Sequence, residues 1–314
     1  MKKLLVILSI ITVFISCKNE VKEAEVKEET EIFEEVTYQD IKHDDYELSK
    51  PVKNIEATLV LFGGFPETAK DVKREFKILE KAKNNDVAVL FMNYNRKLWL
   101  GKSELEELTK DLKTIFNEHN LPEDNMFIGG FSSGGNMALL ISDYMTNGNS
   151  NLVPEGVFIV DSPIDLVALY KTFEKNLKRN LSNSTMEEST WILETLSKEF
   201  GNPHKNLSNY EAFAVFTSET NNFDNIENLK NTRIRLYTEP DTLWWKERTM
   251  AKYDEMNAYY IKSLSESLKN FGFKDVQYIA TKNKGYRSNG DRHPHSWSIV
   301  DKDNLIDWIL KEEL

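Results

Sequence analysis

Cysteine is almost absent from this chain of 314 residues, and the only one, Cys17, can form no internal disulfide. An excess of basic residues is also missing, because 51 Asp and Glu outnumber 40 Lys and Arg and give a formal net charge of -11. Binding to phosphate backbones needs clustered Lys and Arg, so the charge argues against a nucleic-acid partner. Metal-ligand spacings and cofactor fingerprints are lacking too, and we therefore expect no metal and no cofactor.

Long apolar runs are missing as well, apart from one at the N-terminus. Two lysines precede twelve mainly apolar residues, 4–15, a stretch too short to span a bilayer comfortably. With the Ser16-Cys17 step that follows, residues 1–17 resemble a bacterial lipoprotein signal peptide with Cys17 as the lipid-bearing residue. The resemblance implies export and lipid anchoring to a bacterial cell-envelope membrane, on its periplasmic or cell-surface side.

Residues 18–36 are largely charged, with eight Glu and three Lys. We interpret them as a solvated acidic tether between the lipid anchor and a folded body. The remaining residues, 37–314, are long enough for one large domain that carries an insertion. Apolar residues make up 40% of the chain and aromatic residues 11%, which is enough to build a sizeable core.

Beyond the tether, short apolar runs alternate with longer amphipathic segments, the pattern of an α/β protein with a mainly parallel sheet. Most of the runs are almost continuously apolar, as expected for strands buried on both faces. The expected strands are 58–62, 87–92, 125–128, 156–160, 233–238 and 276–280. The expected helices are 69–82, 103–119, 135–144, 252–270 and 297–310.

One connection is much longer than the others. Between residues 160 and 233 the chain contains helical patterns but no convincing strand. A structureless loop of that length is uncommon in a compact domain. We therefore expect a helical cap at about 166–231, inserted over the strand ends where open α/β sheets bind their ligands.

Two adjacent serines follow the third expected strand, in the stretch GGFSSGGNM. A serine is held out as a nucleophile only at a very sharp strand-to-helix turn, which crowds the residues two before and two after it. For Ser132 these residues are Gly130 and Gly134, whereas for Ser133 one of them would be Phe131, which would clash. Ser132 is therefore the nucleophile candidate.

A serine nucleophile needs a histidine base and a carboxylate that orients the histidine, and both are expected after the serine, the acid first. Glu239 and Asp241 follow the expected strand 233–238, and His293 and His295 precede the last helix. The other histidines lie outside this order and are interpreted as surface residues: His43, His119 and His204.

The stretch G-F-S-S-G, the acid after a late strand and the late His-Ser-Trp together make the chain resemble a serine hydrolase of the α/β-hydrolase fold, from about Thr58 to the C-terminus. The acid in such enzymes usually lies a few residues past its strand, which favours Asp241 over Glu239. The usual place of the histidine favours His295 over His293. The resemblance thus implies a triad of Ser132, Asp241 and His295.

The tetrahedral intermediate of such a reaction also needs backbone N–H donors for its oxyanion. The resemblance implies one donor from Ser133, the residue after the nucleophile, and one from the loop after the first central strand. That loop is Phe62-Gly63-Gly64-Phe65-Pro66, with Phe62 in place of the usual His. We expect its donor to be Gly64 or, as second choice, Phe65.

These residues predict a cofactor-independent serine hydrolase that cleaves a carboxylic ester, small or linked to a glycan, through an acyl-enzyme on Ser132. An oligopeptidase-type serine peptidase would use the same triad and is the alternative among enzymes. A non-catalytic binding module on a hydrolase scaffold is the alternative from another class, since a fold alone does not establish activity. Trp244 and Trp245 could wall a substrate pocket, although packing against the cap or the core is the favoured interpretation.

Overall fold

The computed structural model describes residues 37–94 and 96–311, which belong to one compact unit, Val36–Leu314. The expected signal peptide with Cys17, residues 1–17, and the expected tether, 18–36, lie outside the described residues. Export and lipid attachment at Cys17 therefore stay predictions from the sequence. Among the described residues, no helix combines the length and the apolar character that crossing a bilayer requires.

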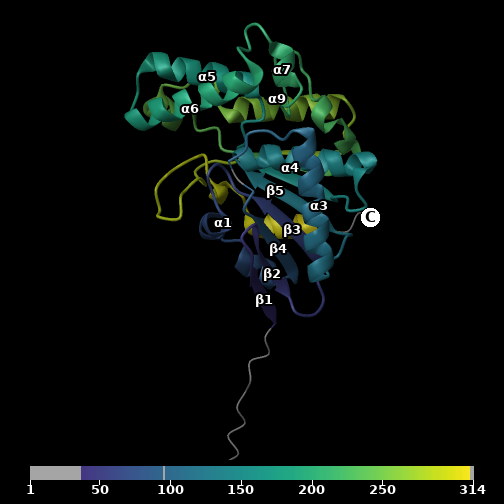
Figure 1. The fold of residues 1–314 in the computed structure, drawn as a ribbon. Helices are drawn as coiled ribbons and strands as arrows, with labels where there is room; N and C mark the ends of the chain where they lie inside the picture. The colour runs from purple at the N-terminus through teal and green to yellow at the C-terminus, as the bar shows by residue number, and fades with distance from the viewer. Residues whose placement is uncertain (1–36, 95, 312–314) are drawn as a thin grey trace, which may run out of the picture. The chain divides into compact units, whose positions relative to one another are not determined.

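The described residues form an eight-stranded sheet with the order β1-β2-β4-β3-β5-β6-β7-β8 (Figure 1). Strand β2 pairs antiparallel with β1 and β4, and every other pairing is parallel. The mainly parallel α/β sheet predicted from the alternating pattern is thus confirmed. The strands are β1 Tyr38–Lys42, β2 Tyr46–Pro51, β3 Ala57–Phe62, β4 Val87–Met92, β5 Met126–Phe131, β6 Gly156–Val160, β7 Arg233–Thr238 and β8 Asp275–Ala280.

Helices cover both faces of this sheet. Val60 and Phe62 of β3 pack on one face, which a first set of three helices covers. Leu59 and Leu61 pack on the opposite face, which a second set of three helices covers. All residues of β3 to β7 are buried, which explains why the sequences of β3 to β6 are almost continuously apolar; β7, RIRLYT, carries two arginines. The first set is α3 Lys102–His119, α4 Ser133–Tyr144 and α9 Asn257–Asn270, and the second is α1 Ala69–Phe76, α2 Leu79–Lys83 and α10 Lys302–Leu310.

Three helix predictions are wrong in their boundaries. The expected helix 252–270 begins only at Asn257, after a 3-10 turn at Tyr253–Glu255. The expected helix 69–82 is two helices, because Lys77 has a left-handed conformation with φ of 53° that ends α1. The expected helix 297–310 begins only at Lys302, since Trp297–Ile299 form a 3-10 turn before it. None of these three breaks contains Gly or Pro, the residues by which a sequence usually shows where a helix begins or ends.

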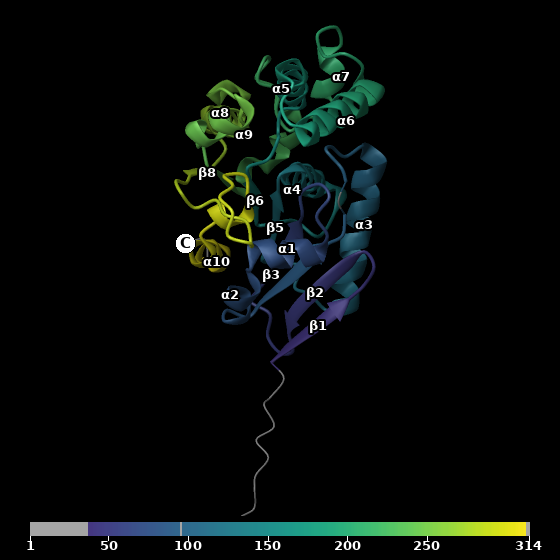
Figure 2. The same cartoon turned by 90° about the vertical axis from the view of Figure 1, so that its left-hand side faces the viewer.

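The long connection after β6 contains helices, as expected for a cap. Helices α5 to α7 pack around an apolar cluster of their own, separate from the two clusters on the sheet (Figures 1 and 2). The 3-10 segment Asp224–Asn231 differs, because its Ile226 and Leu229 pack into the main core on the α4 side of the sheet. The bounds are α5 Leu166–Arg179, α6 Asn183–Phe200 and α7 Leu207–Glu211, and the remaining elements are α8 Thr242–Thr249, a π-helical turn at Met145–Asn149 and a 3-10 turn at Tyr253–Glu255.

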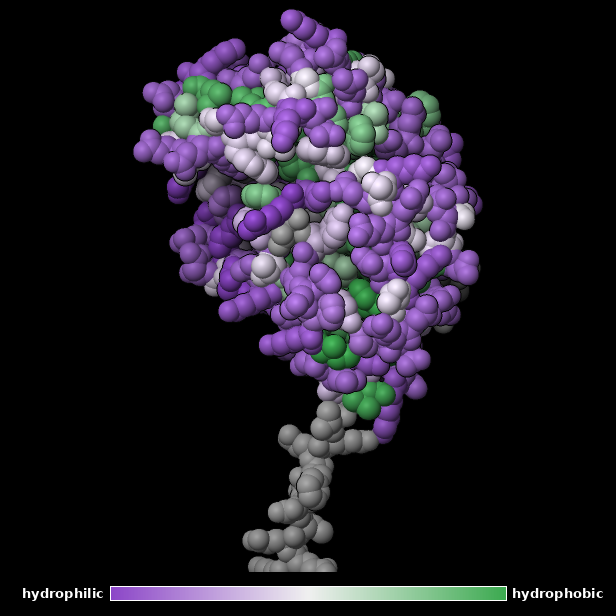
Figure 3. Space-filling model, viewed as in Figure 1, coloured by the Kyte–Doolittle hydropathy of each residue, from purple (hydrophilic) through white to green (hydrophobic). Residues whose placement is uncertain are grey.

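Polar residues cover most of the surface. The face drawn in Figure 3 is hydrophilic over most of its area, and its apolar residues lie in small separate groups. Two of the large apolar side chains that remain exposed are Phe65, 40% exposed, and Trp191, 37% exposed. Both line the same cavity as Ser132, so their exposure indicates that this cavity is a candidate binding site.

Candidate active site

Ser132 lies at the sharp turn between β5 and α4, as predicted. Its backbone has φ of 52° and ψ of -129°, a conformation that non-glycine residues rarely adopt. Such strain costs about 1–3 kcal/mol and persists only where the surrounding structure enforces it. The side chain of Ser132 is half-buried and lines the cavity.

The glycines on either side of Ser132 are needed for this turn. A Cβ atom on Gly130 would lie 2.0 Å from the carbonyl oxygen of Gly134. A Cβ atom on Gly134 would lie 2.3 Å from the carbonyl oxygen of Phe62. Backbone atoms cannot move away cheaply, so the requirement for small residues two before and two after the serine is confirmed.

The other serine, Ser133, makes different contacts from Ser132. It is buried, and its Oγ accepts a hydrogen bond of 3.0 Å from the Phe65 N–H. As the first residue of α4, it has a backbone N–H without an acceptor inside the helix. Ser133 can therefore offer an N–H beside the nucleophile, at the positive end of the helix dipole.

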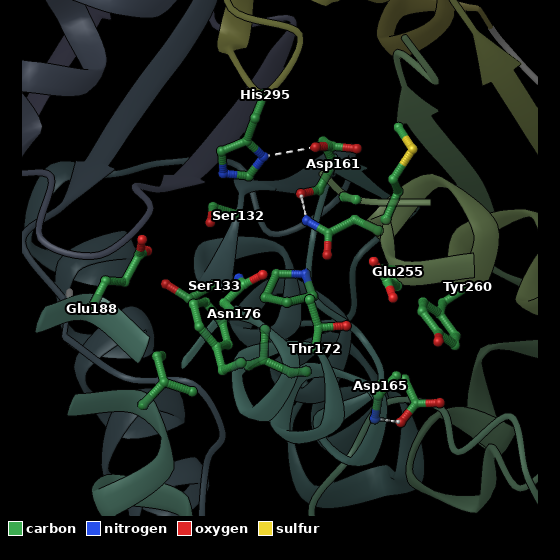
Figure 4. Close-up of a pocket in the computed structure, with 18 of the residues that line it drawn as sticks. Ser132, Ser133, Asp161, Asp165, Thr172, Asn176, Glu188, Glu255, Tyr260 and His295 are labelled. Carbon is green, nitrogen blue, oxygen red and sulfur yellow. Dashed lines mark hydrogen bonds and ion pairs between the residues drawn. The ribbon is translucent and has the colours of Figure 1, made fainter. Parts of the chain in front are cut away.

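His295 faces this turn and binds a carboxylate that the sequence analysis did not select. Its Nδ1 lies 2.7 Å from Oδ2 of Asp161. Figure 4 shows the His295 ring near Ser132, with its other nitrogen on the side of the ring toward the serine. The second carboxylate oxygen of Asp161 accepts a bond of 2.6 Å from the Thr238 hydroxyl. Asp161 is thereby fixed in the orientation that binds the histidine.

The sheet itself places Asp161 beside Ser132. The Ser132 N–H donates to the carbonyl of Val160, the last residue of β6, over 2.9 Å. The Asp161 N–H donates in turn to the carbonyl of Tyr237 in β7, over 2.8 Å. Strand pairing therefore continues one residue past the ends of β5 and β6 and brings serine and aspartate to adjacent positions.

Asp241, the expected partner of His295, lies elsewhere, so that prediction is wrong. One of its carboxylate oxygens is 2.7 Å from the Arg292 guanidinium, and the other accepts the Trp244 N–H at the start of α8. The reason lies in the strand order. Strand β6 neighbours β5 directly, whereas β7 is one strand further away, so an acid at the end of β6 reaches the nucleophile first.

One sequence signal could have found Asp161. It follows directly after the wholly apolar strand GVFIV, at the carboxyl end of the sheet, and it keeps the chain order serine, acid, histidine. Asp161 is not among the expected acids because the family resemblance places the acid after a later strand.

Glu239 anchors the loop that carries His295. Its buried carboxylate accepts hydrogen bonds from the Thr281 hydroxyl and from the Lys284 and Gly285 N–H groups, over 2.9, 2.8 and 3.1 Å. The other oxygen of this carboxylate binds the Arg292 guanidinium. These bonds hold both ends of the segment between β8 and His295.

We expect Glu239→Gln to lower the free energy of unfolding by about 1–3 kcal/mol, because the amide offers one acceptor where the carboxylate offers two. Chemical denaturation monitored by circular dichroism measures this loss. Asp291→Asn is the matched control, since Asp291 is an exposed acid of the same loop. Equal stability of the two variants would show that Glu239 does not anchor the loop.

His293, the alternative base, is half-buried, and its ring lies beside that of His295, with centroids 6.2 Å apart. Its ring packs against Trp244 and Trp245, with centroids 4.8 and 6.0 Å apart. Burial, reinforced by the positive charge of Arg287, lowers the pKa of His293 to about 4. The two tryptophans thus pack against a neutral imidazole rather than against the cap or the core, and Trp245 also borders the cavity.

The expected oxyanion donor Gly64 is already bound. Its N–H donates to Oε2 of Glu67 over 3.0 Å, and the same carboxylate oxygen accepts from the Trp297 indole over 3.1 Å. A Cβ atom on Gly64 would lie 2.9 Å from Cβ of Ser132, so glycine is needed here for close approach. Of the two loop donors expected, Phe65 is the one whose N–H points to the serine turn, where it binds Ser133.

A cavity of about 260 Å³ opens above Ser132 and His295 (Figure 4). Its walls come from the loop after β3, the ends of β5 and β6, the cap helices α5 and α6, and the segment around α8 and α9. The cavity therefore joins the predicted reacting groups to the cap. The described residues contain no group of three or more His, Cys, Asp or Glu side chains that could hold a metal ion.

Comparison with known proteins supports the fold but gives no sequence family. The sequence matches no protein-family model, and no curated protein matches it. Several solved structures do match. An esterase from the bacterial hormone-sensitive lipase family has a TM-score of 0.53 and 12% sequence identity, and the match covers 88% of this chain and 84% of that one.

Two fungal proteins match to a similar degree. A carboxyl esterase from the mycorrhizal fungus Tuber melanosporum has a TM-score of 0.51 and 14% identity, with 86% of this chain and 83% of that one covered. An esterase from Rhizomucor miehei has a TM-score of 0.51 and 15% identity, with coverages of 87% and 80%. The strand order, the strained turn after β5 and these likenesses together show that the chain has the α/β-hydrolase fold.

Proposed function

We propose that the protein is a serine hydrolase that cleaves a carboxylic ester through an acyl-enzyme on Ser132. The observation that carries the proposal is the contact of His295 with Asp161, beside a serine held in a strained turn. The esterases among the structural matches support the ester as the bond that is cleaved.

In this mechanism Ser132 Oγ attacks the ester carbonyl while the free ring nitrogen of His295, Nε2, takes its proton. Asp161 accepts the Nδ1–H of His295, so the base lone pair stays on Nε2 and the imidazolium that forms is stabilised. His295 then gives the proton to the departing alcohol. A water molecule, activated by the same histidine, hydrolyses the acyl-enzyme and restores Ser132.

The oxyanion of the tetrahedral intermediate is bound by backbone N–H groups. We assign the first to Ser133, whose N–H is at the start of α4. Phe65 supplies the second in our proposal, by exchanging its present acceptor, Ser133 Oγ, for the oxyanion. Gly64 contributes space rather than a donor, because its N–H is held by Glu67.

An irreversible fluorophosphonate tests the proposal, because it reacts with activated serines whatever the substrate. We expect one label per folded protein, located at Ser132 by peptide mass spectrometry, and no label on Ser132→Ala. Ser133→Ala is the matched control and is expected to keep the label, since alanine retains the backbone N–H. A folded wild-type protein that takes no label would instead favour a non-catalytic binding module.

A further inference from the structure

The lining of the cavity carries charge of only one sign. Among the described residues that line it, four are carboxylates and none is Lys or Arg. An anionic substrate group would be repelled there, whereas a cationic one would be attracted. The carboxylates are Asp161, Asp165, Glu188 and Glu255.

Three of these carboxylates already have partners in the structure. Each is bound by a cationic side chain, a histidine or N–H groups at distances of 2.6 to 2.9 Å. The pairs are Asp161 with His295, Asp165 with the N–H groups of Ala168 and Ser218, and Glu255 with Lys175 and Arg179. Their charges are therefore largely compensated within the protein.

Glu188 is different. It forms no hydrogen bond or ion pair with any other residue that the structure describes, and it is exposed. Figure 4 shows its carboxylate at the wall of the cavity on the side of Ser132. Desolvation in the cavity wall raises the pKa of Glu188, so a cation that enters the cavity would stabilise the charged form of this carboxylate.

Aromatic rings lie on the same side of the cavity. Trp191 follows Glu188 by three residues on α6, a spacing that places two side chains on one helix face. Its ring stacks on that of Phe65, with centroids 4.5 Å apart and planes inclined by 27°. Aromatic faces attract ammonium groups, and such attraction adds to that of a nearby carboxylate.

We propose that Glu188, with the Phe65–Trp191 pair, forms a subsite for an ammonium group, so that the substrate is an ester carrying a positive charge near the scissile bond. This inference rests on the proposed ester hydrolysis at Ser132. The cap helix α6 then selects the substrate, and the residues at the strand ends perform the reaction.

Two ester pairs, matched in shape but not in charge, test this subsite. For a charge in the acyl part, the probes are the p-nitrophenyl esters of 4-(trimethylammonio)butyrate and of its neutral isostere, 5,5-dimethylhexanoate. For a charge in the alcohol, the probes are butyrylcholine and 3,3-dimethylbutyl butyrate. The measured quantity is the ratio of kcat/KM for the cationic ester to that for the neutral one.

We expect this ratio to be about ten or more for the wild type in one of the two pairs, and to fall with added salt. Glu188→Gln is expected to lower it about tenfold, mainly through the KM of the cationic ester, because a neutral ester offers no charge to bind. Glu187→Gln is the matched control and should keep the wild-type ratio, since Glu187 is an exposed neighbour outside the cavity lining.

Ratios near one in both pairs for the wild type, or a ratio that Glu188→Gln leaves unchanged, would overturn the ammonium subsite. Hydrolysis of the neutral esters and fluorophosphonate labelling of Ser132 would then continue, and the proposed function would stand. Loss of both hydrolysis and labelling in the wild type would instead overturn the proposed function, and the subsite with it.

Discussion

Replacing His295 with alanine is expected to lower kcat by about a million-fold, the loss that removal of the base from a serine triad causes. Ser132 Oγ is barely ionised at neutral pH and needs a base to take its proton. His295 is held for this task by Asp161 and by packing against the tilted ring of Phe131, with ring centroids 4.5 Å apart. Initial rates on a neutral p-nitrophenyl ester measure the effect.

His293→Ala is the control for this substitution. At pH 7 the ring of His293 is neutral, because burial lowers its pKa to about 4, and it packs against Trp244. We expect its loss to leave a small cavity and to reduce kcat by less than about tenfold. An inactive His293→Ala beside an active His295→Ala would reverse the assignment of the base.

The second large effect is expected for Asp161→Asn, with a fall in kcat of about 10⁴-fold. An amide at this position can donate to Nδ1 instead of accepting from it, and the histidine is then held in the tautomer that cannot act as a base. The substitution keeps the size of the side chain, so circular dichroism should show an unchanged fold while the rate collapses.

Asp241→Asn separates the two candidate acids. Asp241 is partly exposed and pairs with Arg292, and exposed ion pairs contribute little, about 0–1 kcal/mol. We therefore expect this variant to keep most of the wild-type activity. If Asp241→Asn were inactive and Asp161→Asn active, Arg292 and Asp241 would have to rearrange around His295, and the geometry described above would not be the reacting one.

Much of the fold could be predicted because each strand is encoded by a short, continuous segment of the chain. Strands β4, β6 and β7 have the bounds expected from the sequence, because β4 and β6 are continuous apolar runs and β7 places apolar residues between its two arginines and after them. The break at Lys77 was missed because its left-handed conformation depends on packing of α1 and α2 rather than on a Gly or Pro.

In the candidate site, too, the sequence predicts what depends on nearby residues and misses what depends on distant contacts. Ser132 was recognised because the steric demand of its turn falls on Gly130 and Gly134, two residues away on either side. The N–H of Gly64, the first expected donor, is bound by Oε2 of Glu67, and this oxygen also accepts from the distant Trp297 indole. The contact between Glu67 and Trp297 joins distant parts of the chain and cannot be recognised from the local motif.

The sequence by itself determined the α/β sheet, the strained turn at Ser132 and the place of His295 before the last helix, because each depends on residues close together in the chain. Only the tertiary structure decided which acid meets that histidine. Asp161, Glu239 and Asp241 all follow buried strands at the carboxyl end of the sheet, so the local pattern does not decide which of them meets His295. The pairing of β6 beside β5 and the anchoring of the His295 loop by Glu239 bring Asp161 to Nδ1, and both depend on contacts between distant segments.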